Sequence, residues 1–225
     1  MHEFFDDIAP HPEGVSPIDD LVHERSYVVR AYRKDNETLL LRGALRDQKP
    51  AGLYVPDDTE PLTVHHMIVD MYVRVPTFEI IDAKAVLETH PHTGCPRIED
   101  HYRNLIGLSI ARGFTHKVRE LFGGPRGCTH TTALLQAMAP VAIQSIWSLR
   151  VLATRAGGGS GGPDFSSPES RERAMAMNIN TCHIWAEDGE QVAAIRAGRP
   201  MEVPVWIVRR YAELGRDPST WRAED

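Results

Sequence analysis

The first half of the chain alternates between apolar and polar residues with a period of two, which is typical of β-strands. Residues 27–33 are β-prone, and after a polar turn residues 38–45 return, so that together they predict a hairpin. Residues 63–75 alternate over their whole length, and a Pro-Thr turn then leads into a fourth apolar segment at residues 78–87. The sequence therefore predicts an antiparallel meander of four strands.

The predicted third strand contains two adjacent histidines whose side chains point to opposite faces of the sheet. His65 is at the head of the apolar row, which continues through Met67 and Val69, whereas His66 begins the polar row. We therefore expect His65 to face the core. At most one of the two histidines can enter any one site.

After residue 91 the apolar spacing becomes that of helices. Residues 100–111 and 116–122 predict two helices, and residues 131–155 predict the longest one, with a broad apolar stripe. Pro140 should kink or split this helix, because proline lacks the amide proton that a helix interior uses. A weaker helical pattern follows at residues 171–178. The predicted fold class is α+β, an antiparallel β-meander of about four strands packed against a helical half.

The length of 225 residues suits one large domain with a sizeable core. We expect an irregular arm at residues 1–24, which are rich in Pro, Asp and Glu, and a single α+β domain at residues 25–210. Within this domain, the glycine-rich residues 156–163 predict a flexible loop. Residues 211–225 should form a polar tail.

Charge and composition limit the kinds of partner that we expect the protein to bind. The net charge of −6 and the isoelectric point near 6.0 argue against nucleic-acid binding, which needs a concentrated basic surface. The apolar stretches are interrupted well before the roughly 18 residues of a membrane span, so we expect no contact with a membrane. A small-molecule substrate is expected, and the helix at residues 131–155 is long enough to supply a homo-oligomer interface.

Cysteine usage indicates the compartment. The three cysteines form an odd set, which fits a reducing environment better than a disulfide framework. The acidic start of the chain lacks the apolar core of a secretory signal. We therefore expect a cytoplasmic protein.

The residues best suited to chemistry are the cysteines and some of the eleven histidines. Thiolates and imidazoles are preferred ligands of zinc and related divalent transition metals. Cys128 lies at the start of the long helix, where the helix dipole favours a thiolate. The alternative is that the cysteines are small buried hydrophobes and the histidines lie on the surface. The expected metal ligands are Cys128, His130, Cys95, Cys182 and His66.

Charged residues near these segments are candidates for acid–base catalysis. Arg46 and Asp47 end the second predicted strand, and Asp100 begins the helix predicted at residues 100–111. Either aspartate could act as a general base. The competing explanations are a surface ion pair for Arg46 and Asp47 and a helix cap for Asp100.

Several of these segments resemble a bacterial family of unknown function, DUF2889. The segments that carry the resemblance are residues 39–47, His65-His66-Met67, residues 105–114, Gly123-Gly124 with Gly127-Cys128-Thr129-His130, and residues 180–185. Together they span roughly residues 25–195. The family has His-Asp-Met where this chain has His65-His66-Met67, and a histidine at position 66 keeps a metal-ligating group there. The resemblance implies membership of the family and assigns no activity.

A weaker, fold-level resemblance is to iron–sulfur scaffold proteins of the IscU/NifU type. In these, antiparallel strands lead to a Gly-Cys turn and then to helices with a second cysteine. The resemblance implies that Cys95 and Cys128 come together. It makes a non-catalytic metal or iron–sulfur scaffold an alternative function, with the cluster less expected than zinc.

The expected function is that of a metal-dependent enzyme, with zinc as the expected metal. Bound zinc makes water nucleophilic near neutral pH, so we expect a hydrolase of a small ester, lactone or related organic acid in a catabolic pathway. Lyase or decarboxylase chemistry at the same metal is a variant. A further alternative is a cofactor-free enzyme with Cys128 as nucleophile and His130 as its base. The sequence identifies no third group to orient His130, and residues two apart on a helix do not face each other.

Overall fold

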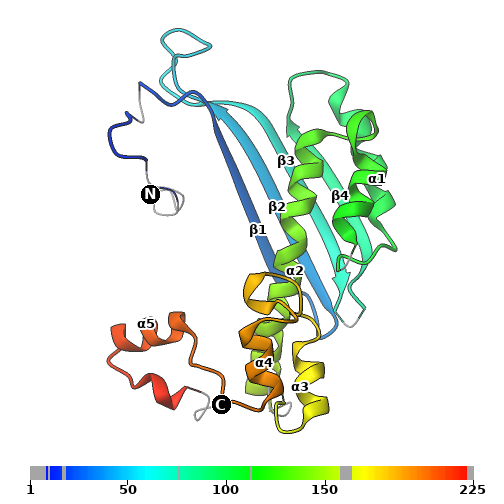
Figure 1. Cartoon of the computed structure of the whole chain (residues 1–225). Coiled ribbons are helices and arrows are strands. Elements are labelled where there is room, and N and C mark those ends of the chain that lie inside the picture. The colour runs from blue at the N-terminus through cyan, green and yellow to red at the C-terminus, as the bar shows by residue number, and fades with distance from the viewer. Residues whose placement is uncertain are drawn as a thin grey trace. The chain divides into compact units, whose positions relative to one another are not determined.

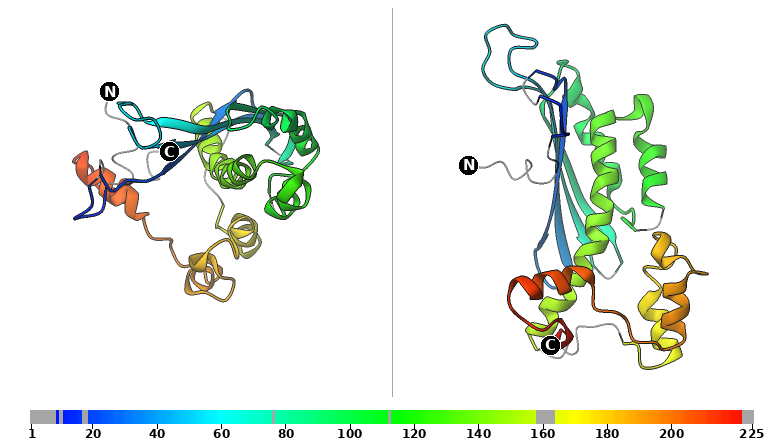
Figure 2. Two further views of the ribbon diagram at one scale, coloured as in Figure 1. Left: turned by 90° about the horizontal axis from the view of Figure 1, so that it is seen from above. Right: turned by 60° about the vertical axis from the view of Figure 1, so that its left-hand side comes forward.

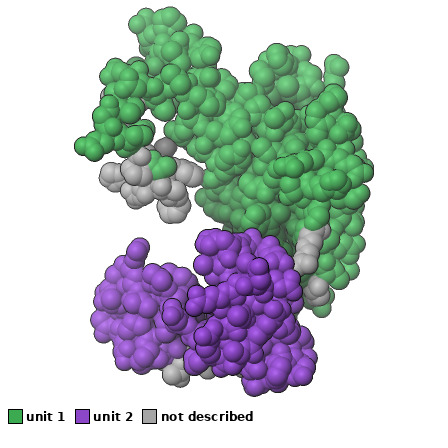
Figure 3. Space-filling view, viewed as in Figure 1, with its two compact units in different colours: residues 1–146 green, residues 147–225 purple. Residues whose placement is uncertain are grey.

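The computed structural model of the chain describes residue 9 and residues 11–16, 19–75, 77–111, 113–157 and 164–221. Residues 1–146 and residues 147–225 form two compact units (Figure 3). The single domain predicted for residues 25–210 stays a prediction. Much of the predicted arm at residues 1–24, and most of the predicted loop at residues 156–163, lie outside the described residues.

The first unit is built on a four-stranded antiparallel sheet (Figure 1). Its strands are β1 (Glu24–Arg33), β2 (Thr38–Lys49), β3 (Leu62–Arg74) and β4 (Glu79–Thr89), in the spatial order β1-β2-β3-β4. This order confirms the predicted meander, and the helices that follow confirm the α+β fold class.

One face of the sheet is buried under helices. Leu41 and Leu45 of β2 and Met67 and Val69 of β3 lie on this face, and each is at most 1% exposed. The helices α1 (Phe114–Phe122) and α2 (Thr129–Arg155) lie on the same side of the sheet (Figure 1 and Figure 2). The core of the first unit therefore lies between the sheet and these helices, and α1 confirms the helix predicted at residues 116–122.

Helix α2 approaches the sheet closely at Gly43. A Cβ atom at this position would lie 2.6 Å from Sδ of Met138, so the absence of a side chain leaves room for the helix. Leu134, Leu135 and Met138 are fully buried in the same core. By length and composition α2 is also apolar enough to cross a membrane, contrary to the sequence expectation. Its buried residues lie between Thr131 and Ile146, and 39% of its most apolar 18-residue window is buried.

Pro140 does not split α2, which runs without interruption from Thr129 to Arg155. Of the two predicted effects, the split is therefore wrong, and the kink stays a prediction. Met138 and Ala142 on either side of Pro140 are fully buried. Their packing offsets the backbone hydrogen bond that the proline cannot make.

The helix predicted at residues 100–111 is wrong in type and position. The chain forms a 3₁₀ helix, η1 (Cys95–Leu105), followed by an irregular segment. Gly107 then adopts a φ of 87°, and its amide donates a hydrogen bond to the carbonyl of Ile80 at 2.8 Å. This bond to the start of β4 takes the backbone out of a helical path. A second short 3₁₀ helix, η2 (Gly124–Arg126), connects α1 to the segment before α2.

The described part of the second unit contains short helices besides the end of α2. They are α3 (Pro168–Met175), η3 (His183–Trp185), α4 (Glu190–Arg196), α5 (Val205–Glu213) and η4 (Pro218–Thr220). Met175, Val192 and Ile195 form a small core of their own. Helix α3 overlaps the weak helical pattern at residues 171–178, and the predicted polar tail contains the end of α5 and η4.

We predict that Gly127→Ala lowers the free energy of unfolding by about 1–3 kcal/mol. A Cβ atom at Gly127 would lie 2.5 Å from the carbonyl oxygen of Phe122, so the backbone must shift to relieve the contact. Equilibrium unfolding in urea measures the effect. Gly94→Ala is the matched control, because nothing lies within 4 Å of its Cβ position, and it should change the free energy by less than about 0.5 kcal/mol. Equal midpoints for the two variants would contradict the prediction.

Candidate functional site

Three residues on neighbouring strands form a row across the buried face at one end of the sheet. Arg25 of β1 pairs in register with Asp47 of β2, and Asp47 pairs with His65 of β3. Residues directly opposite each other in a sheet project to the same side, so their side chains meet. The pairing of β3 changes register on both sides of His65, first with β2 and then with β4. Such bulges are frequent beside functional sites.

Asp47 is the centre of this row and is 1% exposed. Its carboxylate accepts two hydrogen bonds from Arg25, from Nε to Oδ1 at 2.6 Å and from Nη2 to Oδ2 at 2.7 Å. Burial alone would raise the pKa of Asp47. Arg25 lowers this pKa, His130 and His23 lower it as well, and together they bring it below its ordinary value. The hydrogen bond to Asp47 in turn raises the pKa of Arg25. Asp47 is therefore ionised at neutral pH although it is buried.

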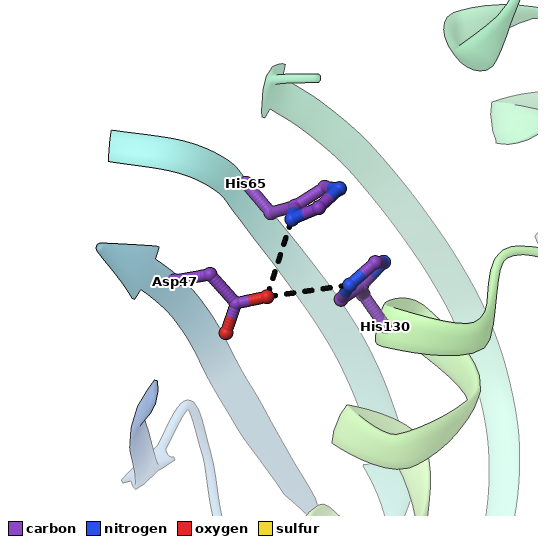
Figure 4. A group of neighbouring side chains, drawn as sticks. All are labelled: Asp47, His65 and His130. Carbon is purple, nitrogen blue, oxygen red and sulfur yellow. Dashed lines mark ion pairs between the residues drawn. The ribbon is translucent and has the colours of Figure 1, made fainter. Parts of the chain in front are cut away.

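Two imidazoles face the same oxygen of Asp47 (Figure 4). Nδ1 of His65 lies 3.2 Å from Oδ2, and Nε2 of His130 lies 3.3 Å from it. The two rings are stacked, with centroids 3.8 Å apart. Nδ1 of His65 is buried and makes no hydrogen bond with the described residues, because its contact with the carboxylate is close but poorly aligned. Two ring nitrogens and one carboxylate oxygen thus lie close together.

His130 reaches the row from the first turn of α2. The amide of Cys128 donates a hydrogen bond to the hydroxyl of Tyr102 at 2.8 Å, which ties the start of α2 to η1. The hydroxyl of Thr132 donates to the carbonyl of Phe122 at 3.1 Å, which ties the same turn to α1. These bonds satisfy groups at a helix end and fix where His130 leaves the helix.

The protonation state of His130 follows from its surroundings. Burial lowers the pKa of His130, the neighbouring His65 lowers it further, and Asp47 opposes these effects without reversing them. His130 is therefore neutral at pH 7. A carboxylate beside a neutral imidazole is the state that metal binding requires of such ligands.

Asp47, His65 and His130 fit a divalent metal ion. Within the described ranges they are the one group of three or more His, Cys, Asp or Glu residues whose ligand atoms lie within 4.8 Å of one another. Tetrahedral coordination with bonds of about 2.0–2.1 Å places neighbouring ligand atoms about 3.3 Å apart. The distances from Oδ2 of Asp47 to the two histidine nitrogens are 3.2 and 3.3 Å. His23 lies beside the other oxygen, with Nε2 3.5 Å from Oδ1.

Cys128 contacts the same histidine from its other side. Sγ of Cys128 lies 3.7 Å from Nδ1 of His130, whose Nε2 faces Asp47. Because Cys128 precedes the first residue of α2, the rule that residues two apart on a helix diverge does not apply. Thiol, imidazole and carboxylate form a continuous chain, and Asp47 is the third group that the sequence did not identify.

The structure brings together part of the predicted site. Asp47 and His130 belong to the Asp47–His65–His130 group. The side chain of His65 lies on the buried face of the sheet, as expected from the alternation of β3. Arg46 and His66 are paired with each other in register on the opposite face of the sheet. No described contact brings either of them to Asp47, because neighbouring residues on a strand diverge.

The remaining predicted residues, Asp100, Cys95 and Cys182, do not belong to the Asp47–His65–His130 group. Asp100 is exposed on η1, and Cys95 packs against the core at the start of η1. Cys182 is exposed and belongs to the second unit. Their predicted roles stay predictions.

The sequence left open which of His65 and His66 faces the site and named His66 as the ligand, and it did not single out Arg25. His65 could have been found, because it is a polar residue at the head of a buried apolar row. Arg25 is at the start of β1, and only the register of β1 with β2 shows that it meets Asp47. No sequence pattern identifies that register in advance.

The family model described as "Protein of unknown function (DUF2889)" matches residues 23–144, more than half of the 225-residue chain. The match includes the row on the sheet and the start of α2, and it ends before residues 180–185, which the sequence resemblance had included. No curated protein and no solved structure matches the chain. The resemblance to the IscU/NifU type therefore stays a prediction.

We predict that the metal-free protein loses stability as the pH falls from about 7.5 to about 5.5, and that His130 causes part of the loss. Its pKa is lower in the folded protein than in the unfolded chain, so the unfolded chain binds the proton first and acidification favours unfolding. The lowered pKa of Asp47 acts in the same direction at lower pH. His130→Gln should therefore show a shallower fall in the free energy of unfolding.

Urea unfolding with a chelator present measures this at each pH. His116→Gln is the control, because His116 is exposed on α1, and its profile should follow the wild type. A His130→Gln profile as steep as that of the wild type would contradict the prediction.

Proposed function

Because the chain belongs to the DUF2889 family, whose description assigns no function, we propose an activity from the chemistry of its own site. The protein is a metal-dependent hydrolase, and Asp47, His65 and His130 hold its metal ion. Zinc is the proposed metal. The proposed substrate is a small ester, lactone or related organic acid in a catabolic pathway, because hydrolysis of such carbonyl compounds is common chemistry for bound zinc.

The observation that carries this proposal is the buried nitrogen of His65 that makes no hydrogen bond. A buried polar atom without a hydrogen bond costs roughly 1–3 kcal/mol. Nδ1 of His65 lies 3.2 Å from the carboxylate of Asp47, but it makes no hydrogen bond with that oxygen or with any other described group. A cation placed among this nitrogen, Oδ2 of Asp47 and Nε2 of His130 would accept a lone pair from each. Metal binding would thereby satisfy an atom that folding leaves unsatisfied.

The types of ligand limit which metal ions the site would bind. Catalytic zinc sites use three protein ligands drawn from imidazoles, carboxylates and thiolates, and they leave a position for water or substrate. Two imidazoles and one carboxylate also suit Fe(II), so elemental analysis decides between the metals. When bound, zinc would activate water for attack on an ester or lactone carbonyl.

Other residues of the site orient these ligands. Arg25 donates to both oxygens of Asp47, which fixes the plane of the carboxylate and keeps it ionised. Nδ1 of His130 is not needed for the metal and can donate its proton to Sγ of Cys128 at 3.7 Å. Such outer contacts set the tautomer and orientation of ligating histidines. Cys128 thus orients a ligand, whereas the sequence had suggested that it was a ligand itself.

The expectations on compartment, partners and oligomeric state form part of the same proposal. The three free cysteines suit a reducing compartment, so the enzyme is proposed to be cytoplasmic. The net charge of −6 supports a small-molecule substrate rather than nucleic acid as the partner. No membrane partner is proposed, and a homo-oligomer through α2 remains part of the proposal.

The contact between Cys128 and His130 favours a second candidate, a cofactor-free enzyme with Cys128 as nucleophile. Nδ1 of His130 would accept the thiol proton while Nε2 donates to Asp47, which orients the ring. The metal mechanism needs the opposite tautomer, with the proton on Nδ1 and the lone pair of Nε2 on the metal. The two mechanisms therefore exclude each other at any moment. The iron–sulfur form of the scaffold alternative has less support, because the described ligand group contains no cysteine.

We predict that the purified protein binds one zinc ion per chain and that His65→Gln and His130→Gln each weaken zinc binding more than about 100-fold. Each change removes one of three proposed ligands. Isothermal titration calorimetry and elemental analysis measure affinity and stoichiometry. His66→Gln is the matched control, since it changes the adjacent histidine on the opposite face and should leave zinc affinity unchanged. Wild-type protein that binds zinc no more tightly than His65→Gln would refute the metal site.

We predict that Cys128→Ser retains zinc and loses no more than about 10–100-fold in hydrolysis of p-nitrophenyl esters and simple lactones, because Cys128 only orients His130. Chelation should abolish the activity. If Cys128 is the nucleophile instead, Cys128→Ser should lose more than about 1,000-fold and chelation should have no effect. Nitrogen-15 spectra of the His130 ring, which distinguish the two tautomers, give an independent answer without any substrate.

A further inference from the structure

Tyr102 lies on η1 and is completely buried, with 0% exposure. Its ring packs against that of Phe122, with centroids 4.9 Å apart. By sequence pattern it is one more apolar position of the core. Its hydroxyl, however, is a polar group taken into that core, and such a group must find a hydrogen-bond partner there.

The partner is the backbone of Cys128. The hydroxyl of Tyr102 accepts a hydrogen bond from the amide of Cys128 at 2.8 Å, and it donates a longer one to the carbonyl of the same residue at 3.4 Å. Amides at the start of a helix have no acceptor within the helix, so a bond from outside is needed. Burial raises the pKa of Tyr102, so the hydroxyl keeps its proton and remains able to both accept and donate.

This hydrogen bond affects the candidate site because Cys128 lies at the start of α2, close to His130. Cys128 is the last residue before α2, and His130 is the second residue of the helix. The position of Cys128 therefore sets how far α2 extends and in which direction the ring of His130 leaves it. A functional side chain must be held to within about 0.5 Å and about 10–20° of its working geometry. The contact from Nε2 of His130 to Oδ2 of Asp47, at 3.3 Å, has little tolerance for a shift.

We infer that Tyr102 is a positioning residue of the site, and that its hydroxyl holds the Cys128 backbone so that His130 meets Asp47 and His65. The effect on metal affinity rests on the proposed function. The effect on the geometry of His130 does not, because it concerns the protein without metal. The path from Tyr102 to the site is short. Its hydrogen bond is to the backbone of Cys128, and only Thr129 lies between Cys128 and His130.

The test is Tyr102→Phe, which keeps the ring and removes only the hydroxyl. We expect faster hydrogen exchange at the Cys128 amide, altered nitrogen-15 shifts of the His130 ring and zinc affinity weakened about 10–100-fold. Tyr32→Phe is the matched control, because Tyr32 is exposed on β1, and it should change none of the three.

The outcomes separate this inference from the proposed function. If wild-type protein binds no zinc, the proposed function fails, and the His130 shifts still decide the role of Tyr102. If Tyr102→Phe changes the Cys128 amide but leaves His130 and zinc affinity as in the wild type, the inference is wrong and the bond serves packing alone. If Tyr102→Phe does not fold, hydrogen exchange of the wild-type protein tests the hydrogen bond from the Cys128 amide. Unprotected, fast exchange at this amide would overturn the inference.

Discussion

The ion pair between Arg25 and Asp47 is the interaction on which the candidate site depends. A carboxylate that is 1% exposed needs a charged partner to stay ionised, because burial alone favours its neutral form. The guanidinium of Arg25 donates to both oxygens, so the negative charge is fixed in place and in plane. His130, whose pKa is lowered, can then approach the same oxygen as a neutral ring beside His65. Rings stacked with centroids 3.8 Å apart would repel each other strongly if both carried a proton.

The site is assembled from segments that are remote along the chain. The sheet supplies a rigid row from three strands, and the start of α2 supplies His130 from above that row. Gly43 allows α2 to lie close to the sheet, while Tyr102 and Thr132 anchor its first turn. The residues that hold the helix are thus separate from the candidate ligands, and each of them can be altered without removing a candidate ligand.

Strand alternation made the sheet predictable, because alternation is a property of the strand itself and needs no knowledge of its neighbours. The 3₁₀ helix η1 was not predictable in the same way, because its end depends on the bond from Gly107 to the distant Ile80. Asp47 and His130 were recognised as candidates, but their proximity depends on strand register and helix docking. The emphasis on cysteine as a ligand came from residue chemistry alone. The described cluster of ligands instead contains one carboxylate and two imidazoles.

The changes of register beside His65 have a consequence for kinetics. A bulge leaves a residue unpaired and interrupts the ladder of hydrogen bonds, so this end of β3 separates from its neighbours at a lower free energy than the middle of the strand does. The side chains of His65 and His130 are 20% and 21% exposed, so an ion would reach them from solvent without opening the apolar layer around Leu41 and Met71. How tightly the site would hold an ion then depends on the row of side chains. Local opening of the irregular strand pairing beside them would affect how fast such an ion exchanges.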